Sequence, residues 1–133
     1  MLKNGLIIMG LMFTGSVFAD VVKIVNVKLV QHATTWRADV TLKHDDKGWK
    51  DYADAWRLVD ENGKEIATRT LYHPHEDGQP FTRSLSGVTI PADVTEILIR
   101  SHDLLSGYSP DTLAIPLTEN IVTDRYEVTR GGR

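Results

Sequence analysis

Hydrophobic and polar residues alternate along most of the chain after its first twenty residues. A period of two is typical of half-buried β-strands, whose successive side chains point to opposite faces. The alternation is clearest in residues 36–43, where Trp36, Ala38, Val40 and Leu42 are expected to face inward. Together with weaker alternating segments, it predicts seven strands, over residues 21–30, 36–43, 52–59, 65–72, 81–85, 96–102 and 112–117.

In the first predicted strand, Val25, Val27 and Leu29 are expected to share the inward face. Turn signals separate the strands, and the strongest is the run Asp60-Glu61-Asn62-Gly63, because Asn-Gly readily adopts the positive φ angles of a tight hairpin. Residues 44–48 are predicted to form a polar loop, in which adjacent carboxylates such as Asp45-Asp46 are expected to be solvated.

The fold class follows from these spacings. Prolines occur too often after residue 73 for long helices. About seven short strands separated by turns predict an all-β chain, an antiparallel immunoglobulin- or fibronectin III-like β-sandwich. Trp56 is expected to lie in its core.

Residues 1–19 have the three parts of a secretory signal peptide. A positive charge at Lys3 is followed by an uncharged apolar run, and the segment ends at Ala19, which makes Asp20 the first residue of the mature chain. An uncleaved anchor is the alternative, but the apolar run is shorter than the ~20 residues that span a bilayer. We therefore expect a periplasmic or secreted protein without a membrane span after cleavage.

Three segments are thus predicted: a signal peptide over residues 1–19, a β-sandwich domain over residues 20–117, and a C-terminal extension over residues 118–133. The extension is either an eighth strand or a tail that docks on a partner. Its final residues, from Thr129 onward, are expected to be disordered.

Composition narrows the chemistry. The formal net charge of −3 is unlike that of a protein with a global basic field, so nucleic acid is not expected as a partner. Cysteine is absent, and the three methionines all lie within residues 1–12. Disulfides, thiolate metal sites and soft copper(I) sites are therefore excluded from the mature chain, and any metal would be held by nitrogen and oxygen ligands.

Residues 72–83 contain the candidate metal ligands. In extended backbone, residues i and i+2 point to the same side, so His73 and His75 could direct both rings at one Cu(II) or Zn(II) ion. Glu76 or Asp77 could add an oxygen ligand. A third side chain could come from one of two pairs elsewhere, His44-Asp45 or His102-Asp103. The alternative is a polar loop with incidental histidines.

Loop aromatics point to a second kind of site. Four aromatic residues lie in or beside predicted loops, where planar rings can contact a peptide or a sugar: Trp49, Tyr52, Tyr72 and Tyr108. Arg83 is either a partner for an anionic ligand or a structural ion pair with a carboxylate across the sheet. Nucleophile elbows, phosphate-binding glycine loops and His-Glu-x-x-His pairs do not occur, so the chain is not expected to be an enzyme.

The longest motifs of the chain are Gly48-Trp49-x-x-Tyr52-Ala53-Asp54-Ala55-Trp56 and Tyr72-His73-Pro74-His75 followed by Gln79-Pro80-Phe81-Thr82-Arg83-Ser84. They resemble an uncharacterised family of small exported bacterial immunoglobulin-like β-sandwich proteins. The resemblance runs from about Val22 to Leu117 and implies an exported sandwich, in a Gram-negative periplasm, without supplying an activity. The layout also resembles, more distantly, small periplasmic copper carriers. Those carriers use an N-terminal histidine, whereas the expected mature chain here begins at Asp20.

The sequence thus predicts an exported binding module with no required cofactor, which recognises a protein or cell-envelope ligand through Trp49, Tyr52, Tyr72 and Arg83. The alternative function is divalent metal binding through His73 and His75.

Overall fold

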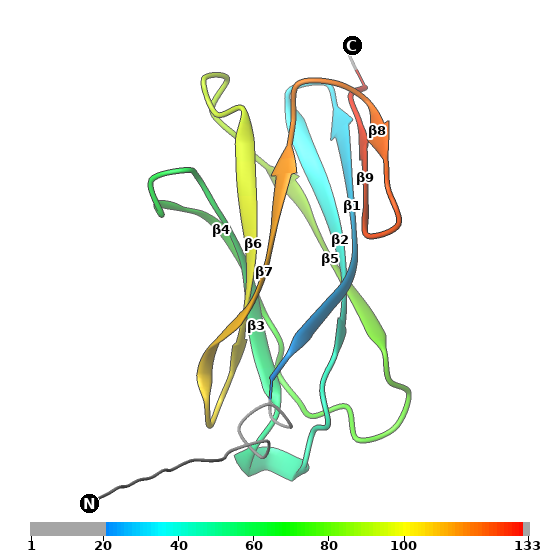
Figure 1. Ribbon diagram of the computed structural model, residues 1–133, viewed down its shortest axis with the longest axis vertical. Helices are drawn as coiled ribbons and strands as arrows, with labels where there is room; N and C mark the ends of the chain where they lie inside the picture. Colours follow the sequence, from blue (N-terminus) through cyan, green and yellow to red (C-terminus); the bar gives the residue numbers. More distant parts are fainter. Residues whose placement is uncertain (1–20, 132–133) are drawn as a thin grey trace, which may run out of the picture.

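Two β-sheets pack face to face in the computed structural model, which describes residues 21–131 (Figure 1). Residues 1–19, the predicted signal peptide, lie outside the described residues. In chain order the elements are β1 (Lys23–His32), β2 (Thr35–Lys43), the short 3-10 helix η2 (Gly48–Lys50), β3 (Ala53–Val59), β4 (Glu65–Thr70), β5 (Phe81–Val88), β6 (Glu96–Asp103), β7 (Gly107–Pro116), β8 (Ile121–Val122) and β9 (Tyr126–Thr129).

One sheet has the order β5-β2-β1-β9-β8 and the other the order β4-β3-β6-β7. Their pairings are antiparallel except for that of β1 with β9. The predicted all-β sandwich is therefore confirmed, while its assignment to the immunoglobulin or fibronectin III type stays a prediction. Within residues 21–131, no helix has the length and apolar character needed to cross a membrane.

The core lies between the two sheets, where their inward residues meet. Trp36, Ala38, Val40 and Leu42 of β2 are all buried, as the alternation predicts, and Trp56 of β3 is fully buried. Because the chain has no disulfides, the burial of these apolar side chains is the main source of its stability.

The prediction for the first strand is wrong at Val25, whose side chain is 39% exposed, whereas Ile24 is buried. The register of β1 against β2 shifts between Ile24 and Asn26. A β-bulge of this kind inserts one residue and so exchanges the faces that successive side chains occupy. The inward pattern therefore runs through Ile24, Val27 and Leu29.

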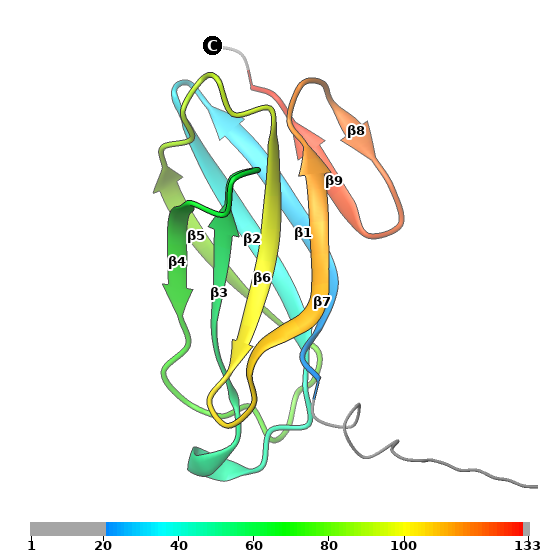
Figure 2. The same ribbon diagram turned by 60° about the vertical axis from the view of Figure 1, so that its left-hand side comes forward.

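The C-terminal segment belongs to the sandwich. The sequence left open whether it forms a strand or a tail that docks on a partner, and it forms the strands β8 and β9. β9 lies beside β1 in parallel register, from Val27 opposite Tyr126 to Val30 opposite Thr129, and β8 folds back against β9 (Figure 2). Val128 is 1% exposed and joins the core. Thr129 was expected to begin a disordered end, and this expectation is wrong, because Thr129 is the last residue of β9.

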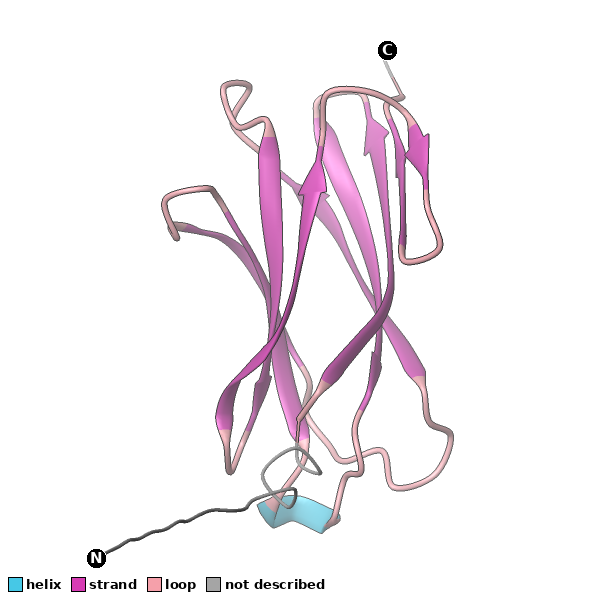
Figure 3. Cartoon of the chain, viewed as in Figure 1, coloured by secondary structure: helices cyan, strands magenta, loops and turns pink. Residues whose placement is uncertain are grey.

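One end of the sandwich gathers three connections, which we call the loop end. They are residues 44–52 between β2 and β3, residues 71–80 between β4 and β5, and residues 104–106 between β6 and β7. Figure 3 shows these connections at the lower end of the molecule, with η2 among them. Because these connections meet in space, residues far apart in sequence can form one site there.

Replacing Trp56 by Ala should lower the free energy of unfolding by about 3–5 kcal/mol, because the truncation leaves a large cavity between the sheets. Trp49→Ala is the matched control, since its side chain is 66% exposed and its loss should change stability by less than about 1 kcal/mol. Urea denaturation of both variants provides the measurement, and equal losses would contradict the assignment of Trp56 to the core.

Candidate metal centre

Three side chains converge on one buried point, two from the connection of residues 44–52 and one from the end of β6. His44 directly follows β2, Asp51 follows η2, and Asp103 is the last residue of β6. Each is at most 8% exposed. One imidazole nitrogen and two carboxylate oxygens of this group lie within 4.8 Å of one another. These are ligand types that bind divalent transition metals.

A fourth residue, Asp46, fixes the orientation of the imidazole. Its Oδ1 lies 2.6 Å from Nδ1 of His44 and also accepts a hydrogen bond from the backbone N–H of Ala53. Its Oδ2 accepts the backbone N–H of His75 at 2.7 Å. A carboxylate that holds one ring nitrogen directs the other, Nε2, toward the centre, an arrangement common behind metal-binding histidines.

Asp103 presents one oxygen to the turn and the other to the centre. Its Oδ2 accepts the backbone N–H of Ser106, while Oδ1 lies 3.6 Å from Nε2 of His44. That Oδ1 is buried and has no hydrogen-bond partner, and the residue is 1% exposed. Two ligands bound to one ion at ~2.1 Å in tetrahedral geometry lie roughly 3.4 Å apart, which is close to the observed separation.

The charges around His44 favour its protonated form when the centre holds no metal. Burial, the largest single influence, lowers the pKa of His44, but the hydrogen bond to Asp46 and the charges of Asp103, Asp46 and Asp51 raise it, and the net effect is a pKa above the usual 6.5. A proton on Nε2 and a metal ion at Nε2 are mutually exclusive, so the same carboxylates that hold the proton would also attract a cation.

The sequence anticipated this centre in part. His44 and Asp103 each belong to a pair named as a source of a third ligand, but Asp51 was not singled out. Asp46 is buried, so the expectation that Asp45 and Asp46 are both solvated is wrong for Asp46 and holds for Asp45. The missed signal is the i, i+2 spacing of His44 and Asp46, because alternate extended residues can turn toward the same interior point. Asp51 has no such signal, because η2 lies between it and Asp46.

The structure brings His73 and His75 together, with their ring centroids 4.6 Å apart. However, the His75 ring stacks on Phe81, and its Nε2 lies 2.7 Å from a guanidinium nitrogen of Arg83. Burial, then the charges of Arg83 and His73, lower the pKa of His75. Neutral His75 thus accepts a hydrogen bond from Arg83, and this cation occupies the position at Nε2 that a metal would need.

The other predicted metal ligands of this segment, Glu76 and Asp77, are exposed. Among residues 21–131, the cluster of three potential ligands is that of His44, Asp51 and Asp103, so the His73–His75 site stays a prediction without a third ligand.

The predicted partner-binding residues are placed at the same end of the molecule. Trp49 and Tyr72 are 66% and 73% exposed, and Tyr52 packs edge-on against Trp49 with ring centroids 6.0 Å apart. Arg83 faces His75 rather than a carboxylate. Two apolar side chains of the neighbouring turn, Leu104 and Leu105, are also exposed.

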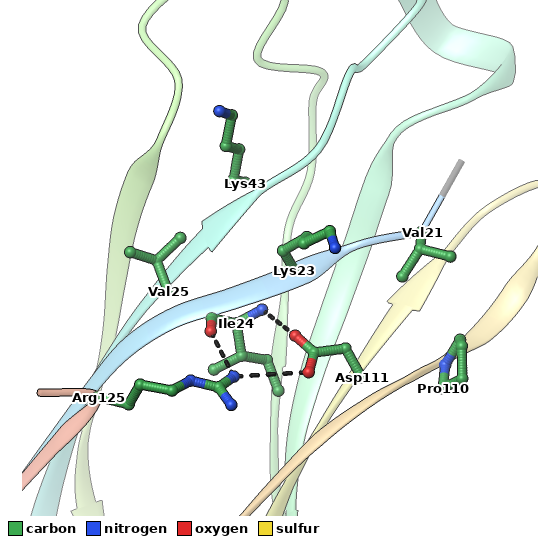
Figure 4. Close-up of a pocket in the computed structure, with 8 residues that line it drawn as sticks. All are labelled: Val21, Lys23, Ile24, Val25, Lys43, Pro110, Asp111 and Arg125. Atoms are coloured by element: carbon green, nitrogen blue, oxygen red, sulfur yellow. Dashed lines mark hydrogen bonds and ion pairs between the residues drawn. The ribbon is translucent and has the colours of Figure 1, made fainter. Parts of the chain in front are cut away.

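A hollow of about 630 Å³ lies beside β1, with Ile24, Asp111 and Arg125 among its lining residues (Figure 4). Two of its polar side chains bind the backbone of β1: Asp111 accepts the N–H of Ile24 at 2.7 Å, and Arg125 donates to the carbonyl of Ile24 at 2.7 Å. These bonds fasten the bulged start of β1 to β7 and to the segment before β9. We therefore assign this hollow a structural role.

The pH dependence of stability reports the environment of His44. Because its folded pKa is raised, protonated His44 stabilises the metal-free fold fully below about pH 6.5, and this contribution is lost as the pH rises through the folded pKa. His44→Gln should therefore show a smaller fall in unfolding free energy above pH 6.5 than the wild type, measured by urea denaturation in EDTA. The lowered pKa of His75 changes the unfolding free energy only below pH 6.5, so His75 does not contribute to the fall measured above that pH.

The matched control is His32→Gln, at an exposed position of β1, which should keep the wild-type slope. Identical slopes for the wild type and His44→Gln would contradict the raised pKa.

Comparison with known proteins gives one partial relative. A protein of Halomicrobium mukohataei named "Putative lipoprotein" is 37% identical over 76 residues. The match covers 57% of this chain, and this chain spans only 37% of the length of that protein. No family model matches the chain, and no solved structure matches it. The sequence is therefore similar to part of a named lipoprotein, and its site must be interpreted from its own residues.

Proposed function

We propose that this protein is an exported β-sandwich module that binds a divalent cation through His44, Asp51 and Asp103. The observation that carries the proposal is the buried Oδ1 of Asp103, which lacks a hydrogen-bond partner and lies 3.6 Å from Nε2 of His44. A buried carboxylate oxygen without a partner is costly, and a cation between these atoms would remove that cost.

Charge supports the same proposal. Formally, the three carboxylates of Asp46, Asp51 and Asp103 outnumber the single imidazolium of His44 by two. Uncompensated negative charge inside a protein is unfavourable, so a divalent ion that replaces the proton on His44 would bring the cluster closer to neutrality.

The ligand set indicates which ions are suitable. One imidazole with two carboxylates suits Zn(II), Cu(II) or Mn(II), whereas Mg(II) and Ca(II) prefer all-oxygen sites. Since all three ligands are buried, the ion would serve to hold the loop end together or to present it to a partner. We propose binding rather than catalysis as the activity.

Export rests on two observations. Residues 1–19 have the signal-peptide pattern, and the partial relative carries the name of a lipoprotein. That name describes the relative, and lipid attachment is not carried over to this chain, which has no cysteine thiol. Periplasmic or secreted location follows from the same proposal.

A second candidate function is recognition of a protein or cell-envelope ligand at the loop end. Its support is the exposure of Trp49, Tyr72 and Leu105 there, since exposed large apolar side chains that gather on one surface are typical of interaction sites. The two functions are compatible, because Trp49 belongs to the loop that supplies His44 and Asp51.

Titration with Zn(II) should show one tight site in the wild type. Asp51→Asn should weaken it at least about tenfold, because a neutral amide is a poor metal ligand. Isothermal calorimetry on the mature chain gives the affinity, with Cu(II) and Mn(II) as further probes and Mg(II) as the expected non-binder. Saturating Zn(II), at about a hundred times the dissociation constant, should also raise the unfolding free energy by about 2.7 kcal/mol.

His73→Ala is the matched control, since His73 is exposed and lies outside the centre. It should bind Zn(II) as the wild type does. Loss of binding in His73→Ala with retention in Asp51→Asn would move the site to the His73–His75 pair. Absence of binding in the folded wild-type protein would refute the proposed function.

A further inference from the structure

The outer face of the sheet β4-β3-β6-β7 carries two arginines directly opposite one another. Arg57 of β3 and Arg100 of β6 are register partners in antiparallel strands. Their chain neighbours, such as Trp56 and Ile99, point into the core, so both arginines are directed outward. Like charges at directly opposite positions destabilise a sheet unless a compensating group lies between or over them.

Both guanidinium groups lie over one aromatic ring. Their central carbons are 5.2 Å (Arg57) and 4.2 Å (Arg100) from the centroid of Tyr108 on β7. His102 meets the same ring edge-on, with centroids 4.8 Å apart. These contacts hold two flexible cations in defined positions, which lowers the entropy that a ligand must remove on binding.

The positive charge of this pair is only partly balanced. Arg57 Nη1 lies 3.5 Å from Glu65, whose side chain is half exposed, and Arg57 Nε is buried with no hydrogen-bond partner. No carboxylate of residues 21–131 forms an ion pair with Arg100. The face therefore keeps a positive charge in a chain whose formal net charge is −3.

We infer that this arginine face, defined by Arg57, Arg100 and Tyr108, binds a ligand through an oxyanion group: a carboxylate, sulfate or phosphate. Guanidinium groups present planar N–H donors that match the oxygens of such groups, and an anion between them would offset their mutual repulsion. Thr112, the register partner of Arg100, places a hydroxyl in the same row.

This inference is independent of the cation centre, because none of its residues belongs to that centre. The oxyanion can come from a free anion or from an acidic saccharide, which would place its sugar ring near Tyr108. Both sources share the same chemistry of recognition, and the choice between them is a matter for experiment.

The test follows the arginine Nε–Hε signals of the mature protein by NMR during titration with sodium phosphate, sodium sulfate and sodium glucuronate, at constant ionic strength. We expect saturable shifts at Arg57 and Arg100. Phosphate binding in Arg100→Gln should be about tenfold weaker or lost. Glucuronate binding tighter than that of both inorganic anions identifies a saccharide ligand, and the reverse order identifies a free anion. Glucose, which lacks the charge, should cause no shift.

Two variants separate binding from folding. Arg37→Gln, on the other sheet, is the matched control, because Arg37 is already engaged with Asp39, Ser84 and Ser86, and it should bind phosphate as the wild type does. Glu65→Gln removes the carboxylate that competes for Arg57 and should tighten binding several-fold. Shifts that stay linear to high anion concentration, or a Glu65→Gln variant that binds more weakly than the wild type, would overturn the inference.

Discussion

The loop end depends on the buried carboxylate of Asp46. Its two oxygens accept hydrogen from the imidazole of His44, from the backbone of Ala53 at the start of β3, and from the backbone of His75. A buried carboxylate is costly unless such donors surround it, so each of these contacts offsets part of the cost of burying Asp46. One side chain thereby joins two long loops to the sandwich and sets the direction in which His44 points.

The amide side chain of Gln79 extends this connection. Gln79 accepts the backbone N–H of His44 through Oε1 and donates to the carbonyl of His75 through Nε2. The turn after β6 is joined as well, because Leu104 donates its N–H to the carbonyl of Tyr52. The proposed cation centre and the exposed aromatic rings thus rest on one hydrogen-bonded support. Occupancy of the centre would stiffen the surface that carries Trp49 and Tyr72.

Most of the sandwich could be predicted from local pattern, and most of the centre could not. The alternation at Trp36, Ala38, Val40 and Leu42 gives β2 and its inward face directly, because a strand buries every second residue. The prediction that Val25 faces inward is wrong because a bulge arises from the pairing of two strands, and the pattern within one strand does not reveal that pairing. The centre combines Asp51 with Asp103, and a contact between residues so distant in sequence follows from topology rather than from spacing. The spacing of His73 and His75 predicts a metal site. The contact that opposes it comes from Arg83 on β5, and this contact depends on the fold rather than on the spacing.

The central claim is that a cation binds between His44, Asp51 and Asp103, and anomalous diffraction from crystals grown with Zn(II) tests it most directly. We expect a zinc peak about 2.0–2.1 Å from Nε2 of His44, with carboxylate oxygens of Asp51 and Asp103 at about 2.0–2.2 Å. A zinc peak at His73 and His75 instead, or no peak at the His44 centre at saturating zinc, would contradict it.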